Sequence, residues 1–299
     1  MESDMREARQ GGAEDGTERR SAMIHLSGFG DEISPDIEEQ MKVLGSEKIR
    51  HIELRGVGGK NVLDLTDAEL EEIELKMIDR DFEVSAVASP IGKIRIDEDF
   101  DAHLERLKRA IEVAQFFETS LIRVFSFYPP QGGDIKKHRG EVIRRMEAMA
   151  ALAEENDVVI CHENEAKIYG EGPKECLDIL KTATSGNLRA VFDPANFVLA
   201  GARPYDDCWP LLRDYVEYFH IKDAKAKEKT IVAAGEGDGQ IKSVLRDAVK
   251  REFEGFVSLE PHLAQAGQFQ GFTGPELFVK AIRALKEILD SIGAEYDAK

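Results

Sequence analysis

The sequence has few cysteines, no long apolar run and a shortage of basic side chains. Its three cysteines, Cys161, Cys176 and Cys208, form no CxxC pair and are odd in number, so we expect no disulfide framework. No segment approaches the roughly 20 apolar residues that a transmembrane helix needs. The first residues contain no apolar stretch of the kind found in signal peptides. These absences together predict a cytoplasmic protein.

Basic side chains are too few for a nucleic-acid or anionic-membrane partner. The chain carries 40 Lys and Arg against 58 Asp and Glu, which gives a formal net charge of −18. Such a surface repels phosphate backbones and anionic lipid headgroups. We therefore expect neither nucleic acid nor a membrane among its partners.

Composition and patterning divide the 299 residues into three segments. Residues 1–22 are polar and have no apolar face to bury, which predicts a disordered lead-in. We expect residues 23–292 to form one domain and residues 293–299 to form a C-terminal tail. A single domain of this length can bury a large core.

Short apolar runs alternate with amphipathic helical stretches along this domain. We expect a helix over 35–44 with Ser34 as its N-cap, and Thr66 at the N-cap of the next helix. The alternation implies parallel pairing through crossover helices, and eight such pairs predict an α/β fold, a single (β/α)₈ TIM barrel. A doubly wound open sheet would normally carry a GxGxxG loop, which is absent. The expected strands are 24–30, 50–54, 83–88, 121–127, 157–163, 188–192, 216–221 and 256–260.

Four successive strands of this barrel end in a residue that can bind a metal. They are Glu163, Asp193, His220 and Glu260. A single acidic residue after a strand is more often a helix cap, but neighbouring strands lie only about 4.8 Å apart, so four in series converge. Three converging carboxylates need a cation to neutralise them. One imidazole and three carboxylates predict a divalent ion, with Mn²⁺ first and Co²⁺, Mg²⁺, Zn²⁺ or Fe²⁺ as alternatives.

These residues lie in motifs that resemble the sugar phosphate isomerase/epimerase family, also called the xylose isomerase-like TIM barrel superfamily. The resemblance spans nearly all of the chain after the lead-in. It implies that Glu163, Asp193, His220 and Glu260 bind one metal ion, and that Glu163 and Glu260 act as acid and base on opposite faces of the substrate. The matching segments are HENE (162–165), FDPANF (192–197), HIKDA (220–224), GEGDG (235–239) and SLEPH (258–262), with GFGDEIS (28–34) and IELRG (52–56) at the first two strand ends.

The function that this resemblance implies is that of a metal-dependent sugar or polyol isomerase or epimerase, working by proton transfer through a metal-bound enediolate. A metal-dependent lyase acting on a keto-sugar or keto-glycoside, by dehydration or elimination, is the alternative and would use the same site. The DNA-repair endonuclease branch needs a larger, histidine-rich metal cluster and a basic face, whereas this chain has seven histidines in all and a net charge of −18. A non-catalytic scaffold would have no need of four converging charged groups. The expected partner is a small carbohydrate or polyol, and the resemblance implies a homodimer or homotetramer.

Other polar residues near the strand ends are candidates for binding substrate hydroxyls. Arg55 and Arg123 could instead be salt-bridge partners inside the strand layer, and Lys222 could pair with a neighbouring acid. Glu165 is also a reserve candidate for the acid or base, because strand alternation could turn it to the same side as Glu163. The full set is Glu53, Arg55, Ser89, Arg123, His162, Glu165, Asn196, Lys222 and His262.

Overall fold

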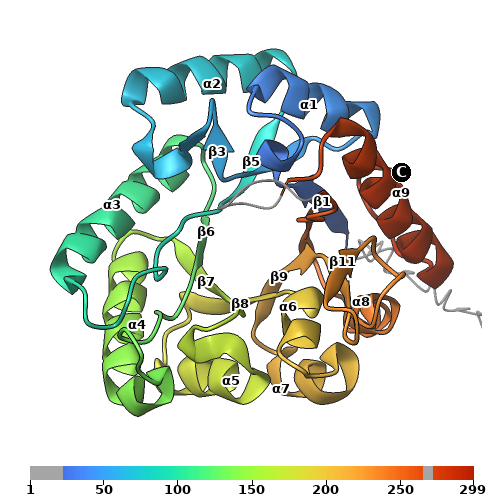
Figure 1. The fold of residues 1–299 in the computed structure, drawn as a ribbon. Coiled ribbons are helices and arrows are strands. Elements are labelled where there is room, and N and C mark those ends of the chain that lie inside the picture. The colour runs from blue at the N-terminus through green and yellow to red at the C-terminus, as the bar shows by residue number, and fades with distance from the viewer. Residues whose placement is uncertain (1–22, 265–271) are drawn as a thin grey trace, which may run out of the picture.

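Eight parallel strands form the centre of the molecule (Figure 1). The computed structural model describes residues 23–264 and 272–299, so the predicted disorder of 1–22 lies outside the described residues. The strand order in the sheet is β1-β12-β9-β8-β7-β6-β5-β2. The strands are β1 Ile24–Gly28, β2 His51–Leu54, β5 Glu83–Val87, β6 Leu121–Val124, β7 Val159–Glu163, β8 Leu188–Phe192, β9 Val216–Ile221 and β12 Gly255–Leu259.

The two end strands of this sheet meet, so the sheet curls into a nearly closed barrel. A bridge between Phe29 and Glu53 links the chain after β1 to β2. All seven strand pairs in the sheet order are parallel. The predicted (β/α)₈ TIM barrel is confirmed.

Helices surround the barrel as an outer ring (Figure 1). Among the described residues, no helix is both long and apolar enough to cross a membrane. Two short hairpins, β3 Gly56–Val57 with β4 Lys60–Asn61 and β10 Asp223–Lys225 with β11 Thr230–Val232, follow β2 and β9. The helices are α1 Ile37–Ser46, α2 Asp67–Asp79, α3 Phe100–Phe116, α4 Arg139–Glu154, α5 Pro173–Thr182, α6 Pro194–Leu199, α7 Trp209–Leu212, α8 Ile241–Lys250 and α9 Pro275–Ile292.

Two local predictions have different outcomes at the helix starts. Thr66 caps α2, and a capping box with Glu69 strengthens that start, so this prediction is confirmed. The prediction that Ser34 caps α1 is wrong. Asp36 is the N-cap, because its carboxylate accepts a hydrogen bond from Glu38 N, while Ser34 Oγ accepts one from Asp36 N.

The fourth strand ends earlier than the predicted 121–127. It stops at Val124, because the next backbone groups leave the sheet. Phe125 N donates to Ile91 O at 2.7 Å, and Phe127 N donates to Gly92 O at 3.0 Å. The segment 125–127 is therefore held by the loop after β5 and not by a strand ladder.

Apolar side chains pack both outside and inside the barrel. The larger cluster lies between strands and helices. A smaller cluster fills the barrel interior and takes one residue from each of five neighbouring strands: Ala86, Leu121, Cys161, Val191 and Tyr218. This layer of apolar side chains lies between the two ends of the barrel.

Residues after α9 return to the barrel. Gly293 ends the helix with φ 70°, a conformation that glycine adopts without strain. Ile24 N then donates to Glu295 O at 3.0 Å, and Asp297 N donates to Ile24 O at 3.1 Å. The predicted tail, 293–299, thus runs beside the start of β1.

Candidate metal centre

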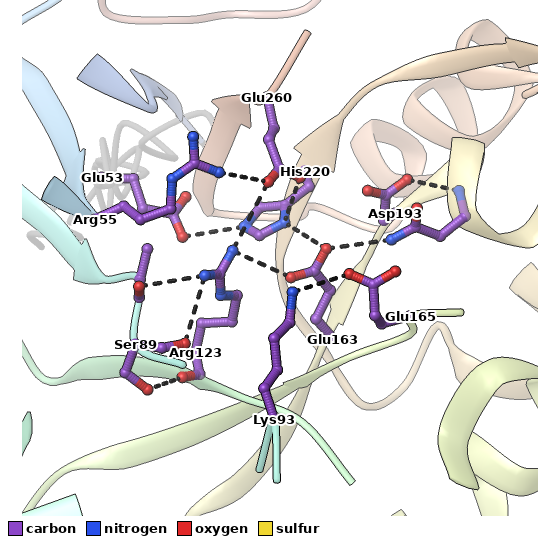
Figure 2. A network of polar contacts seen from close by, with 12 residues as sticks. Glu53, Arg55, Ser89, Lys93, Arg123, Glu163, Glu165, Asp193, His220 and Glu260 are labelled. Carbon is purple, nitrogen blue, oxygen red and sulfur yellow. Dashed lines mark hydrogen bonds and ion pairs between the residues drawn. The ribbon is translucent and has the colours of Figure 1, made fainter. Parts of the chain in front are cut away.

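The four predicted metal ligands lie together at the carboxyl ends of neighbouring strands. Glu163 ends β7, Asp193 follows β8, His220 lies in β9 and Glu260 follows β12. One ligand atom from each lies within 4.8 Å of the others, and all four side chains are buried. Figure 2 shows their head groups pointing toward one another. The barrel order explains this, because β7, β8, β9 and β12 are successive neighbours in the sheet.

His220 is the centre of the group. Its Nδ1 lies 3.2 Å from Glu163 Oε1 and 3.7 Å from Glu260 Oε2. Its other nitrogen, Nε2, lies 3.0 Å from Glu53 Oε1, which also accepts a hydrogen bond from Tyr218 O–H at 3.1 Å. A carboxylate on Nε2 keeps the proton there and leaves Nδ1 to face the other three residues.

Asp193 combines a structural and a site-facing role. Its Oδ1 accepts a hydrogen bond from Asn196 N at 3.0 Å, and so it caps α6. Its Oδ2 points the other way and lies 2.8 Å from Lys222 Nζ. Asn196 returns toward the site, donating from Nδ2 to Glu163 Oε1 at 3.4 Å. Asp193 therefore caps a helix with Oδ1, as an acid after a strand often does, while its Oδ2 faces the site.

Three buried cations compensate the carboxylates. Lys222 Nζ lies between Asp193 Oδ2 and Glu260 Oε2, 3.0 Å from the latter. Arg123 Nη1 is 3.3 Å from Glu163 Oε2 and 3.8 Å from Glu260 Oε1. Arg55 Nη1 is 3.2 Å from Glu260 Oε1. The two arginines and Lys222 therefore form salt bridges, as the alternative interpretation of these residues expected, and these bridges lie within the site. Figure 2 draws the ion pairs of the two arginines.

The crowding of charges moves the pKa values in opposite directions. Burial raises the pKa of Asp193 to about 6, with Lys222 opposing the shift. Burial alone would raise the pKa of Glu163, but His220 and Arg123 outweigh it and lower the pKa to about 2. Burial alone would lower the pKa of His220, but Glu53 and Glu163 raise it to about 10. Without a metal, His220 is therefore a cation that shares its protons with two carboxylates.

The donor set fits a divalent metal ion. Glu163 Oε2, Asp193 Oδ2 and His220 Nδ1 are buried atoms whose contacts with described residues are ion pairs outside hydrogen-bond geometry, with Arg123, Lys222 and Glu163 in turn. The ion pairs balance charge but leave the hydrogen-bonding capacity of these atoms unused. Three carboxylates and one imidazole match the oxygen-rich ligand set of Mn²⁺, Mg²⁺ or Co²⁺. His220 must lose its Nδ1 proton for ligation, so metal and proton compete for that atom.

Four further predicted substrate residues lie at different places around the four ligands. His262 lies beside the four, with Nε2 3.4 Å from Glu260 Oε1. Glu165 is at the rim, where it pairs with Lys93 Nζ at 3.1 Å (Figure 2). Ser89 donates from Oγ to Arg123 O at 2.5 Å. His162 is turned away, since its Nε2 lies 2.9 Å from Ser126 Oγ, so the structure does not bring it to the others.

Sequence reasoning missed two buried acids on the far side of the site. Asp31 Oδ2 accepts a hydrogen bond from Arg55 Nε at 2.7 Å. Glu32 Oε1 lies 3.1 Å from His262 Nε2, and Glu32 Oε2 accepts a hydrogen bond from Thr273 Oγ1 at 2.6 Å. Both belong to the GFGDEIS segment that carried part of the resemblance. Two consecutive acids directly after the first strand were the signal that could have found them.

Comparisons with known proteins place the chain in a family. Residues 36–288 match the model of the xylose isomerase-like TIM barrel family. No protein of curated function matches the chain. Many solved structures share its fold.

Three of these solved structures illustrate the similarity. One is described as a D-tagatose 3-epimerase-like protein, with 16% identity, a TM-score of 0.72 and coverage of 90% of this chain and 98% of that one. The probable 3-DHS dehydratase AsbF of Bacillus anthracis has 17% identity, a TM-score of 0.69 and coverage of 88% and 98%. A xylose isomerase-like protein of Mycobacterium smegmatis in complex with magnesium has 15% identity, a TM-score of 0.66 and coverage of 92% and 98%.

Identities this low show a shared fold and nothing finer. The family match does more, because it covers most of the described barrel, from before α1 into α9. The chain belongs to the xylose isomerase-like TIM barrel family.

Proposed function

We propose that this chain is a divalent-metal-dependent sugar or polyol isomerase or epimerase. The observation that carries the proposal is the convergence of ligand atoms of Glu163, Asp193, His220 and Glu260 within 4.8 Å of one another, all on buried side chains. The likeness to an epimerase-like protein and to a magnesium-bound relative supports it. Mn²⁺ is our first choice of metal, with Mg²⁺, Co²⁺ and Zn²⁺ as alternatives. A homodimer or homotetramer and a cytoplasmic location remain predictions.

Glu163 and Glu260 are the proposed acid and base. They approach His220 Nδ1 from strands β7 and β12, which lie on either side of β8 and β9 in the barrel. A substrate bound between them presents opposite faces to the two carboxylates. One glutamate takes the proton from the carbon next to a carbonyl, and the other donates a proton to the opposite face or to the neighbouring carbon. Each glutamate therefore alternates between charged and neutral forms.

A bound divalent ion would supply Lewis acidity, which stabilises negative charge on the substrate oxygens next to the carbon that loses its proton. The chain's own cations assist from fixed positions. Arg123 is fully buried and touches both glutamates, so it holds their orientation while the charge shifts from one to the other. Lys222 Nζ lies 3.0 Å from Glu260 Oε2, and His262 Nε2 lies 3.4 Å from Glu260 Oε1.

The pKa of Glu260 shows what these neighbours do. Burial alone would raise it, but Lys222 and His262 outweigh burial and lower the pKa well below its usual range. Glu260 is therefore ionised at neutral pH, the form that a general base requires. Glu260 gives up an accepted proton readily, because the neighbouring cations favour its charged form over its protonated form.

The test is solvent hydrogen exchange. Metal-loaded protein is incubated in D₂O with aldoses, ketoses, inososes and keto-sugars, and deuterium at carbon is followed by NMR. We expect deuterium to enter next to a carbonyl with a new stereoisomer or positional isomer. Glu260→Gln should lose this exchange, whereas Glu217→Gln, which changes a half-exposed acid paired with Arg189, should keep it.

The outcomes separate the alternatives. Exchange accompanied by loss of water or of an aglycone would assign the site to a lyase. Loss of exchange in Glu165→Gln but not in Glu260→Gln would move the acid or base role to the rim. Absence of bound metal together with absence of exchange for every substrate would overturn the proposal.

A further inference from the structure

A second group of potential ligands lies at the opposite end of the barrel, where the strands begin. His25 is the second residue of β1, His51 is the first of β2, and Asp297 belongs to the segment that follows α9. Ligand atoms of the three lie within 4.8 Å of one another. This end is remote from Glu163 and its neighbours, which occupy the carboxyl ends of the strands. Nothing in the proposed function uses these three residues.

The returning C-terminal segment places Asp297 between the two histidines. Its backbone pairs with Ile24, and its Oδ1 accepts a hydrogen bond from Leu26 N at 3.0 Å. These bonds fix the carboxylate and aim Oδ2 at the imidazoles. Oδ2 lies 2.9 Å from His25 Nδ1 and 3.5 Å from His51 Nδ1. One oxygen therefore faces two ring nitrogens.

The rings are also held on their other sides. Phe256 packs against both, with ring centroids 5.7 Å from His25 and 5.1 Å from His51. His51 Nε2 faces the carboxylate of Glu83 at 3.7 Å. A carboxylate behind the second nitrogen is the usual arrangement for a metal-binding histidine, since it orients the ring and fixes the tautomer.

His51 Nδ1 distinguishes this group from a simple hydrogen-bonded clasp. The atom is buried and makes no hydrogen bond with residues 23–264 or 272–299. It lies 3.5 Å from Asp297 Oδ2. A hydrogen bond between His25 and Asp297 alone would not require a second imidazole nitrogen beside the carboxylate.

We propose that His25, His51 and Asp297 form a Zn²⁺ site at the amino-terminal end of the barrel, with water as the fourth ligand. Tetrahedral Zn²⁺ with bonds of about 2.0 Å keeps its ligand atoms about 3.3 Å apart. The two distances from Asp297 Oδ2, 2.9 and 3.5 Å, bracket that value. The side chains of His25 and Asp297 are 37% and 26% exposed, which leaves room for water. Two imidazoles favour Zn²⁺ over Mg²⁺ or Ca²⁺.

The bound ion would fasten the C-terminal segment to both strands that close the barrel. Asp297 comes from the last residues of the chain, His25 from β1 and His51 from β2. These two strands are the ends of the sheet order and meet through the Phe29–Glu53 bridge. The site therefore joins three segments where the two end strands of the sheet order meet.

The test measures zinc per chain by atomic emission after chelation and dialysis against Zn²⁺. A double variant, Asp193→Asn with His220→Gln, first removes two ligands at the other end. We expect it to retain one equivalent of zinc. Adding His51→Gln should remove that zinc, whereas adding His138→Gln, a histidine at the start of α4, should not. Zinc should also raise the melting temperature only where His51 is present.

The outcomes are distinct for the two ends. Absence of zinc in the folded double variant, or its retention after both His25→Gln and His51→Gln, would overturn the site. Circular dichroism confirms folding, and Asp297→Asn provides a second variant if a histidine substitution unfolds the chain. One equivalent in both wild type and double variant would support this site and contradict only the proposed metal centre.

Discussion

The two ends of the barrel gather metal-binding side chains in different ways. At the carboxyl end, three carboxylates and one imidazole are 0–4% exposed, and Lys222, Arg123 and Arg55 compensate their charge. At the amino end, two imidazoles share a single partly exposed carboxylate. Burying several like charges is unfavourable unless counter-charges accompany them. Burying charge therefore costs more folding free energy at the carboxyl end, as expected of a site whose charges take part in chemistry. The group at the amino end is suited instead to holding segments of the chain together.

Replacing one carboxylate by an amide at each end should give the largest difference in activity between the two ends. Glu163→Gln removes a proposed acid or base, so hydrogen exchange into substrate should fall about 10²- to 10⁴-fold. Asp297→Asn removes the single acid of the other group and should leave exchange within about twofold, because no catalytic group depends on it. NMR in D₂O measures both. Equal losses in the two variants would show that the ends are coupled and would contradict the assignment.

The carboxylates behind the histidines should differ by a smaller factor. Glu53 is fully buried and lies 3.0 Å from His220 Nε2, so Glu53→Gln should weaken Mn²⁺ binding about 10- to 100-fold. Glu83 lies 3.7 Å from His51 Nε2 with a side chain 82% exposed, and Glu83→Gln should change Zn²⁺ binding much less. Calorimetric titration of each metal gives both values. An effect of Glu83→Gln as large as that of Glu53→Gln would contradict the structural difference.

Histidines at the two ends should give the metal-free protein opposite pH dependence. Burial alone would lower the pKa of His262, but Glu260 and Glu32 raise it to about 9. A raised pKa contributes stability below the unfolded value of about 6.5, and this is lost as pH rises through about 9. Burial lowers the pKa of His51, so its contribution is present above about 6.5 and is lost as pH falls.

Urea unfolding across pH 5 to 10 measures this contrast. His262→Gln should flatten the alkaline side of the stability profile by about 2 kcal/mol, a value reduced for the partial exposure of the ring. His51→Gln should flatten the acid side by less, since its charges are better solvated. Opposite assignments of the two limbs would show that these pKa directions are wrong.

The sequence predicted that four residues converge at the carboxyl end, because strand position carries that information. Glu163, Asp193 and Glu260 stand at strand ends, and a closed barrel brings such ends together. The amino end was not predictable in this way. His25 and Asp297 are 272 residues apart, and only the return of the chain after α9 joins them. Glu32 differs, because its position after the first strand was a usable signal, and only its contact with Thr273, 241 residues away, was not predictable.

The layer between the two ends provides the smallest test. Ser27 Oγ and Ser85 Oγ lie 2.6 Å apart in the barrel interior, above His25 on the same strand. Ser27→Ala leaves Ser85 without this partner and should cost about 1 kcal/mol of unfolding free energy, while the double change to alanine should cost less than the two single changes combined. Metal content at both ends should stay unchanged, because a neutral hydroxyl pair carries no charge from one end to the other. A shift in zinc or manganese affinity in Ser27→Ala would show that the interior layer couples the two ends.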